Sequence, residues 1–229
     1  MIHLNNVSYT YEKGGGVSNI NMSIGDDECA FLIGPTGSGK TTLLRLIYMD
    51  LLPQVGNVVI DKYDSSNIKQ KGISLLRRKV GMIFQNYHLL NDRNLFENIA
   101  LPLHVIGYDK DEIIDLVAES LEEVGLDGKE SHFPDELSGG EQQRACVARA
   151  IIKSPDIILA DEPTGNLDPV TSFELIKLLE EVNKEGTAIL MASHNYNLIK
   201  GRGHRIIEIQ DGSMRRSYWI NLFFCFLRE

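Results

Sequence analysis

The octapeptide GPTGSGKT, which runs from Gly34 to Thr41, matches the pattern G-x-x-x-x-G-K-[ST] at every required position. A short apolar run, residues 29–33, precedes it, and a segment with helical apolar periodicity, residues 42–47, follows it. A Gly/Ser/Thr-rich turn could simply join a strand to a helix, but this strand–loop–helix context favours a loop whose backbone N–H groups wrap a chain of phosphates. The octapeptide therefore predicts a nucleotide site in an α/β fold.

The residues of this loop have different expected roles. Lys40 would supply a positive charge to the β- and γ-phosphates, and the Thr41 hydroxyl would bind Mg²⁺. The helix that starts here presents its positive dipole end to the same anion. We expect the nucleotide to contact Gly34, Pro35, Thr36, Gly37, Ser38, Gly39, Lys40, Thr41 and Thr42.

Composition favours one sizeable α/β domain with an ordinary core. The chain has 229 residues, of which 43% are apolar and 24% charged. Its net charge of −9, from 32 acidic and 23 basic residues, argues against a general nucleic-acid binder, which normally shows a basic surface. We therefore expect no nucleic-acid partner.

The cysteines and the apolar stretches bear on where the chain works. Cys29, Cys146 and Cys225 are far apart and odd in number, so they predict neither a disulfide framework nor a C-x-x-C metal site. The first residues lack the features of a signal peptide, and no apolar stretch reaches the roughly 20 residues that span a bilayer. We expect a soluble chain in a reducing cytosol, with Cys29 and Cys146 in the core.

Periodicity predicts strands alternating with helices, which indicates a mostly parallel sheet covered on both faces. The first part is β-rich, and three glycines, residues 14–16, supply a turn. Helical periodicity then dominates from about residue 94 to 152, as an insertion between strands. The expected strands are 2–11, 17–24, 29–33, 56–60, 80–84, 157–160, 187–192 and, last, 205–209; the expected helices include one that ends at 75–79, then 111–124, 141–152 and 171–183.

A second motif is an apolar strand, residues 157–160, that ends in the paired carboxylates Asp161 and Glu162. Open α/β sheets bind ligands at the carboxyl ends of their strands. Asp161 suits Mg²⁺, which prefers oxygen ligands, and Glu162 is the candidate to polarise an attacking water. Two acids could also merely begin a loop, but the phosphate loop makes the functional interpretation the better one.

A third motif, LSGGEQQR at residues 137–144, is the point at which the sequence resembles the ATPase subunits of ABC (ATP-binding cassette) transporters. It matches the signature sequence of that family in full. Ser138, Gly139 and Gly140 precede a predicted helix and so form a second anion-binding N-terminus. The resemblance implies that these residues and Glu141 close over the γ-phosphate of ATP bound to another subunit. It thus implies a homodimer that encloses two ATP molecules.

The resemblance also implies roles for single residues that would be weak signals alone. Gln85 would contact Mg²⁺ and the attacking water, and His194 would contact the γ-phosphate. Asp168 would lie at the dimer contact. Tyr11 would stack on adenine, with Tyr9 as the alternative two residues earlier. The implied reaction is in-line transfer of a phosphoryl group from ATP to water.

The segment DEPTGNLD, residues 161–168, resembles the subgroup that serves lipoprotein release, macrolide-type efflux and cell division. The match covers nearly the whole chain and is closest to the division ATPases, with Asp92 and Arg93 as the deciding detail. It implies an integral membrane partner, contact with division proteins and a place on the cytoplasmic face of the plasma membrane. A lipoprotein-release or macrolide-efflux ATPase is the alternative. Soluble ABC ATPases of DNA repair or translation fit less well, because they usually carry coiled-coil insertions or two cassettes.

The expected organisation is a single nucleotide-binding domain over residues 1–229. An ATP-binding core would comprise residues 1–93 and 153–216, and a helical subdomain with the signature would comprise residues 94–152. Residues 217–229 form a mostly apolar tail, too short to span a bilayer, that could pack on the core, dock on a partner or a bilayer, or be a non-native terminus.

Overall fold

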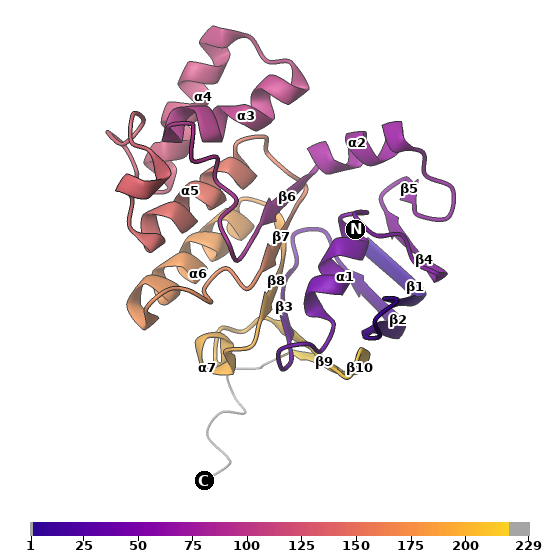
Figure 1. The fold of residues 1–229 in the computed structure, drawn as a ribbon. Helices are drawn as coiled ribbons and strands as arrows, with labels where there is room; N and C mark the ends of the chain where they lie inside the picture. The colour runs from indigo at the N-terminus through magenta and orange to yellow at the C-terminus, as the bar shows by residue number, and fades with distance from the viewer. Residues whose placement is uncertain (1, 220–229) are drawn as a thin grey trace.

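A six-stranded, mostly parallel sheet carries the phosphate loop in the computed structural model, which describes residues 2–219 (Figure 1). From one edge to the other its strands are β10 (Ser213–Trp219), β9 (Arg205–Gln210), β3 (Cys29–Ile33), β8 (Ala188–Ser193), β7 (Ile157–Asp161) and β6 (Val80–Ile83). All neighbouring strands run parallel except β10, which is antiparallel to β9. The loops that follow β3, β6, β7 and β8 therefore lie side by side at the carboxyl ends of the parallel strands.

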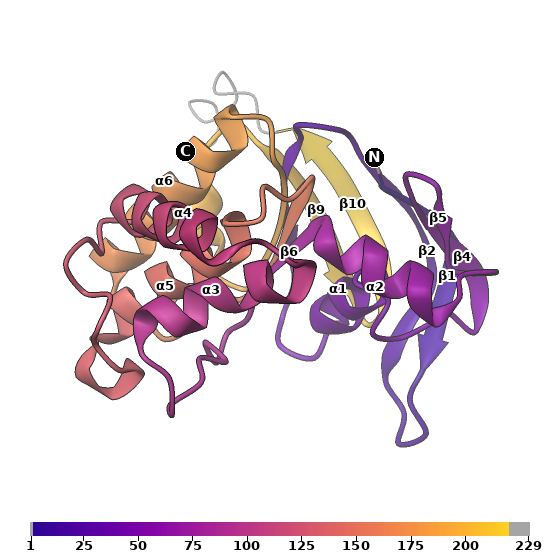
Figure 2. The same ribbon diagram turned by 90° about the horizontal axis from the view of Figure 1, so that it is seen from above.

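A second sheet is antiparallel and consists mainly of N-terminal strands. Its order is β2 (Gly16–Ile24), β1 (Ile2–Thr10), β4 (Val55–Ile60) and β5 (Tyr63–Asp64). Helix α1 (Lys40–Ile47) lies between the two sheets, with α2 (Gln70–Arg78) beside it (Figure 2). The apolar side of α1 packs with residues of both sheets in one continuous core. This packing fixes the start of α1, and with it the phosphate loop.

The segment between β6 and β7 is helical, as the periodicity predicts. It contains α3 (Leu95–Ile106), α4 (Lys110–Glu123), the short 3₁₀ helix η1 (Pro134–Glu136) and α5 (Gly139–Ile151). Together with α6 (Pro169–Lys184) and α7 (Tyr196–Ile199), these helices lie on the opposite side of the parallel sheet from α1 (Figure 1). A second core joins them to that sheet. The predicted α/β fold class is confirmed.

The structure differs from expectation at the end of the chain. The strand expected to be last is followed by β10, which lies at an edge of the sheet and has no clear apolar alternation that would have predicted it. The first three residues of the expected tail, 217–219, belong to β10, and Tyr218 packs against the core. The remainder of that tail, with Cys225, lies outside the described residues.

Two further expectations concern the cysteines and the membrane. Cys29 and Cys146 are buried free thiols, as predicted. Burial raises the pKa of each to about 12, so both thiols are protonated at neutral pH. Within residues 2–219, none of the helices has the length and apolar character of a bilayer span.

Candidate functional site

The phosphate loop joins β3 to α1 and is closely approached by backbone from two other strands. A Cβ on Gly34 would lie 2.1 Å from the carbonyl oxygen of Ile209. Gly39, the residue that caps α1, has φ of 107°, and a Cβ there would lie 2.9 Å from the carbonyl oxygen of Gly16. Both positions require glycine, because any other side chain would push the loop away from the sheets.

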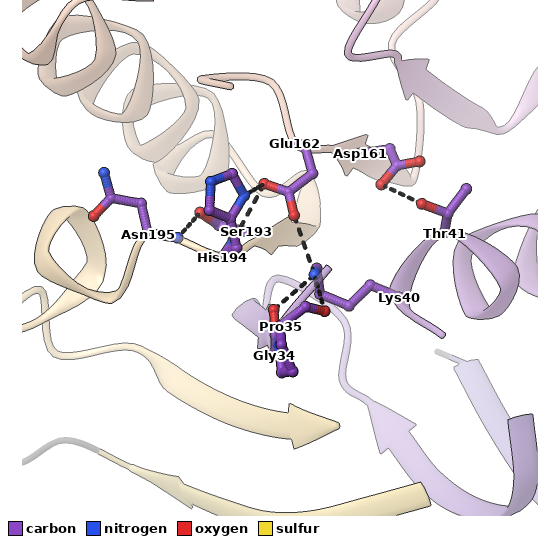
Figure 3. A network of polar contacts seen from close by, with 9 residues as sticks. All are labelled: Gly34, Pro35, Lys40, Thr41, Asp161, Glu162, Ser193, His194 and Asn195. Carbon is purple, nitrogen blue, oxygen red and sulfur yellow. Dashed lines mark hydrogen bonds and ion pairs between the residues drawn. The ribbon is translucent and has the colours of Figure 1, made fainter. Parts of the chain in front are cut away.

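Lys40 opens α1 with an ammonium group that is held by three oxygen atoms (Figure 3). Its Nζ donates to the carbonyl oxygens of Gly34, at 2.7 Å, and Pro35, at 3.2 Å. The third contact is an ion pair of 3.2 Å with Glu162 Oε1. The Lys40 side chain is only 5% exposed, so this charge is fixed at the loop rather than free in solvent.

Glu162 follows β7 directly and is held by groups from two neighbouring loops. Besides Lys40, its carboxylate contacts His194, whose Nδ1 lies 2.8 Å and whose backbone N–H nitrogen lies 3.2 Å from Oε2 (Figure 3). The backbone N–H of Asn195 donates to the hydroxyl of buried Ser193, which shapes the turn that carries His194. Glu162 has φ of 49°, a left-handed conformation that costs a non-glycine residue energy and is often found at functional sites.

Thr41 and Asp161 bring a hydroxyl and a carboxylate together beside this network. The Thr41 hydroxyl donates to Asp161 Oδ1 at 3.1 Å. Burial raises the pKa of Asp161 above its ordinary value, while the Thr41 hydrogen bond opposes that shift. Gln85 lines the same hollow as these two residues. Three oxygen-bearing side chains beside a phosphate loop are the donor set that Mg²⁺ takes together with nucleotide oxygens, so the residues fit that ion.

A cleft of about 380 Å³ lies over the phosphate loop. Ten of the residues predicted from the sequence line it: Tyr11, Thr36, Gly37, Gly39, Lys40, Thr41, Thr42, Gln85, Glu162 and His194. Tyr11 faces the cleft, whereas Tyr9 packs edge-on against the Tyr11 ring and is partly buried against the core between the sheets.

Some predicted loop residues lie beneath the cleft, and others in the lining were missed. Gly34 and Pro35 point their carbonyls at Lys40, and Ser38 is buried with an unpartnered hydroxyl. Gly15 and Gly16 line the cleft, although their run of glycines was interpreted only as a turn. A Cβ on Gly16 would lie 1.9 Å from the carbonyl oxygen of Tyr9, so that position requires glycine, whereas Gly15 has φ of 79° and open space around it.

The loop after Gln85 is clamped to α5. Tyr87 and His88 both have left-handed backbone conformations, with φ of 55° and 51°. The guanidinium of Arg149 donates to the carbonyl of Tyr87 at 2.7 Å and to that of His88 at 2.6 Å. Further along, buried Asn98 bonds the backbone of Leu90 through both its amide oxygen and its amide nitrogen. This loop therefore connects the cleft to the helical segment.

The signature lies at the start of α5 and outside the cleft. Ser138 is the N-cap of α5, and Glu141 completes a capping box with it. A Cβ on Gly139 would lie 3.0 Å from the Tyr87 hydroxyl, so Gly139 packs against the clamped loop. Of the cleft's described lining residues, none comes from Ser138, Gly139, Gly140 or Glu141.

Asp168 caps another helix and is likewise away from the described lining of the cleft. Its carboxylate accepts hydrogen bonds from the backbone N–H groups of Val170, at 2.9 Å, and Thr171, at 3.1 Å, and so starts α6. A hydrogen bond from the Thr171 hydroxyl, followed by these backbone bonds, lowers the pKa of Asp168. The residue thus has a local structural role besides the expected dimer contact.

Comparison with known proteins identifies the family. Residues 17–165 match the ABC transporter family. The cell division ATP-binding protein FtsE of Bacillus subtilis is 43% identical over 217 residues, which cover 94% of this chain and 95% of that protein. FtsE of Escherichia coli (strain K12) is 42% identical over 215 residues, which cover 93% of this chain and 97% of that protein.

Solved structures of ATP-binding cassettes have the same fold. The dimeric post-hydrolysis form of the cassette MJ0796 bound to ADP and Pi has a TM-score of 0.87 and 34% identity, covering 96% of this chain and 99% of that one. CbiO1 from Clostridium perfringens, part of the transporter complex cbiONQ, has a TM-score of 0.86 and 26% identity, covering 94% of this chain and 87% of that one. The chain belongs to the ABC transporter family, and it is an ATPase of the ATP-binding cassette type.

Proposed function

We propose that this ATPase is the FtsE-like subunit of a membrane complex that acts in cell division. The observation that carries the proposal is identity of 42–43% to FtsE proteins of several bacteria over nearly the full length of both chains. The complex would contain an integral membrane partner similar to FtsX, and ATP binding and hydrolysis would control cell-wall hydrolases. The chain would then lie at the cytoplasmic face of the plasma membrane, held there by its partner and near other division proteins.

In the proposed mechanism ATP occupies the cleft, with its phosphates in the loop between β3 and α1. Tyr11 stacks on the adenine, and the loop N–H groups with Lys40 neutralise the phosphates. Thr41, Asp161 and Gln85 would hold Mg²⁺, which would draw charge from the β- and γ-phosphate oxygens. Glu162 polarises a water that Gln85 and His194 help to place. The water oxygen bonds to the γ-phosphorus, the bond to the bridging oxygen breaks, and ADP and phosphate leave.

The active form in this proposal is a homodimer. The N-terminus of α5, with Ser138, Gly139, Gly140 and Glu141, lies outside the cleft of its own chain and would meet the γ-phosphate bound to a second copy. Asp168 would lie at the contact between the copies. The dimeric form of MJ0796 bound to ADP and Pi, which shares this fold, supports the arrangement.

The cellular role can be tested by recovering the tagged chain from membranes and identifying what comes with it. A small membrane protein of the FtsX kind, together with a block in division when the chain is depleted, is the expected result. A larger permease, with division unaffected, would instead place the chain with the lipoprotein-release or efflux ATPases. Wild-type protein should restore division in depleted cells, whereas E162Q should not, because the ATP cycle is blocked.

A further inference from the structure

The carboxylate of Glu141 holds the hydroxyl that the proposed dimer needs. Ser138 Oγ donates to Glu141 Oε2 at 2.7 Å, and the Ser138 backbone N–H donates to the same oxygen at 2.8 Å. A serine hydroxyl has a single proton to donate. Ser138 must therefore leave Glu141 before it can donate to a phosphate oxygen.

Lys129 pairs with the other oxygen of the same carboxylate. Lys129 lies in the segment that links α4 to α5, and its Nζ contacts Glu141 Oε1. The pairing and the Ser138 bonds lower the pKa of Glu141 to about 2, with Lys129 as the largest cause. Glu141 is therefore charged at neutral pH and bonded to the hydroxyl that would face the second copy in the proposed dimer.

The backbone fixes Lys129 in place. The Lys129 N–H donates to the carbonyl of Leu126 at 3.2 Å, and its carbonyl accepts from His132 at 3.0 Å. The same turn is tied to the start of α3, because the N–H of Leu95 donates to the carbonyl of His132 and that of Phe96 to the carbonyl of Glu130. Lys129 is thus presented to Glu141 by a turn with its own hydrogen bonds, and not by a free surface chain.

A charged Glu141 creates an electrostatic problem at a composite site. A carboxylate that contacts Ser138 Oγ lies within a few ångströms of any γ-phosphate that the same hydroxyl binds, and two anions at that distance repel each other. The Lys129 charge offsets that repulsion and makes the carboxylate a weaker acceptor for the Ser138 hydroxyl, which contacts its other oxygen. Because the Lys129 and Glu141 side chains are only partly exposed, at 35% and 19%, solvent screens the charges incompletely.

We infer that Lys129 is a positioning residue of the composite site: it neutralises Glu141 and so lets Ser138 transfer its hydrogen bond to the γ-phosphate of ATP bound to a second copy of the chain. The inference rests on the proposed homodimer. Lys129 lies in a segment without a recognisable motif, and the inference gives it an indirect role in binding the γ-phosphate.

The test is a double-mutant cycle in full-length protein that also carries E162Q, so that ATP persists. Dimer formation is measured by analytical ultracentrifugation against ATP concentration for the parent, K129M, E141Q and K129M/E141Q. Glutamine keeps the capping box, so E141Q removes charge with little change of shape. K129R keeps the charge, and K110M removes an exposed lysine at the start of α4 as a matched control. Thermal melts check folding, and fluorescent-nucleotide binding to the monomer checks the cleft itself.

We expect K129M to raise the ATP concentration for half-maximal dimerisation roughly tenfold. Loss of one partly screened positive charge close to a phosphate has an effect of that size. K129R and K110M should match the parent, and monomer affinity for nucleotide should not change. In the E141Q background K129M should have no further effect, and added salt should shrink the K129M defect. Equal K129M defects in both backgrounds would show a merely structural role and overturn the inference, as would an ATP response of K129M equal to that of the parent. A parent that never dimerises with ATP would refute the proposed composite site, and the inference with it.

Discussion

Lys40 Nζ lies 3.2 Å from Glu162 Oε1, so the cation proposed for the phosphates is paired with the carboxylate proposed for the water. Both side chains are largely buried, at 5% and 12% exposure. A γ-phosphate entering the cleft would compete with Glu162 for Lys40, while His194 keeps hold of the other carboxylate oxygen. Nucleotide binding would then release Glu162 toward the water, which couples occupation of the loop to assembly of the catalytic group.

Glu162→Gln tests the role of the carboxylate in polarising the attacking water. The substitution removes the charge that polarises water, and we expect ATP hydrolysis to fall roughly 100-fold or more. Nucleotide affinity should be equal or higher, because an amide competes less well than a carboxylate for Lys40. Phosphate release and titration calorimetry measure the two effects, and ultracentrifugation should find a stable ATP-bound dimer. E185Q, at an exposed glutamate after α6, is the matched control. Hydrolysis at the wild-type rate would remove Glu162 from the mechanism.

Lys40→Ala tests the role of the lysine charge in binding the phosphates. Loss of a charged donor to the phosphates should cost about 2–3 kcal/mol of binding free energy, roughly a 30- to 160-fold weaker affinity for ATP. The double variant K40A/E162Q should recover part of that loss, because it no longer leaves an unpaired carboxylate facing the phosphates. Titration calorimetry is the measurement, with K62A as a control at a lysine over the Tyr63 ring. Unchanged affinity in K40A would contradict the role of Lys40.

Those parts of the site that are contiguous in sequence were predictable from sequence. The phosphate loop, the acids after β7 and the cap of α5 each combine a turn, a strand end or a helix start with the chemistry that follows it. These segments lie close together because parallel strands bring their carboxyl ends to the same side of the sheet, and alternating strands and helices already indicate parallel strands. The fold class and most helices and strands could therefore be inferred before any coordinates.

The features of the fold and the site that sequence did not predict depend on contacts between distant segments. Gly16 lines the cleft only because β2 crosses the phosphate loop, and β10 forms because β9 offers an edge to pair with. Lys129 and Arg149 are ordinary charged residues by pattern, and their partners, Glu141 and the Tyr87 carbonyl, are revealed only by tertiary structure. Sequence periodicity carries no information about such pairs.

Arg149→Ala should loosen the loop that follows Gln85. The guanidinium holds two carbonyls of residues in left-handed conformation, and its loss leaves strained backbone without those bonds. A cost of about 1.5–3 kcal/mol would speed amide hydrogen exchange in residues 86–92 roughly 10- to 160-fold. Hydrolysis should fall while nucleotide affinity of the monomer stays the same, since Arg149 is not among the cleft's described lining residues.

The comparison for that loop uses two further variants. R149K should give an intermediate exchange rate, because an ammonium cannot span both carbonyls as the guanidinium fork does. R78A removes an exposed arginine at the end of α2 and should leave the loop unchanged. Exchange in residues 86–92 of R149A that equals the wild-type rate would show that the clamp does not hold the loop.

Lys153 predicts a pH dependence of stability. Its Nζ donates to the carbonyls of Arg77, at 2.6 Å, and Val80, at 2.8 Å, and burial lowers its pKa from 10.5 to about 8. Between those values the unfolded chain keeps a proton that the folded chain has released, so the free energy of unfolding should rise with pH. The gain is at most about 3 kcal/mol and is complete above the unfolded pKa. Urea unfolding of wild type and K153M at pH 7.5 and 10 isolates this group. The free energy of unfolding of wild type should rise relative to that of K153M between pH 7.5 and 10. An equal difference between the two proteins at both pH values would contradict the lowered pKa of buried Lys153.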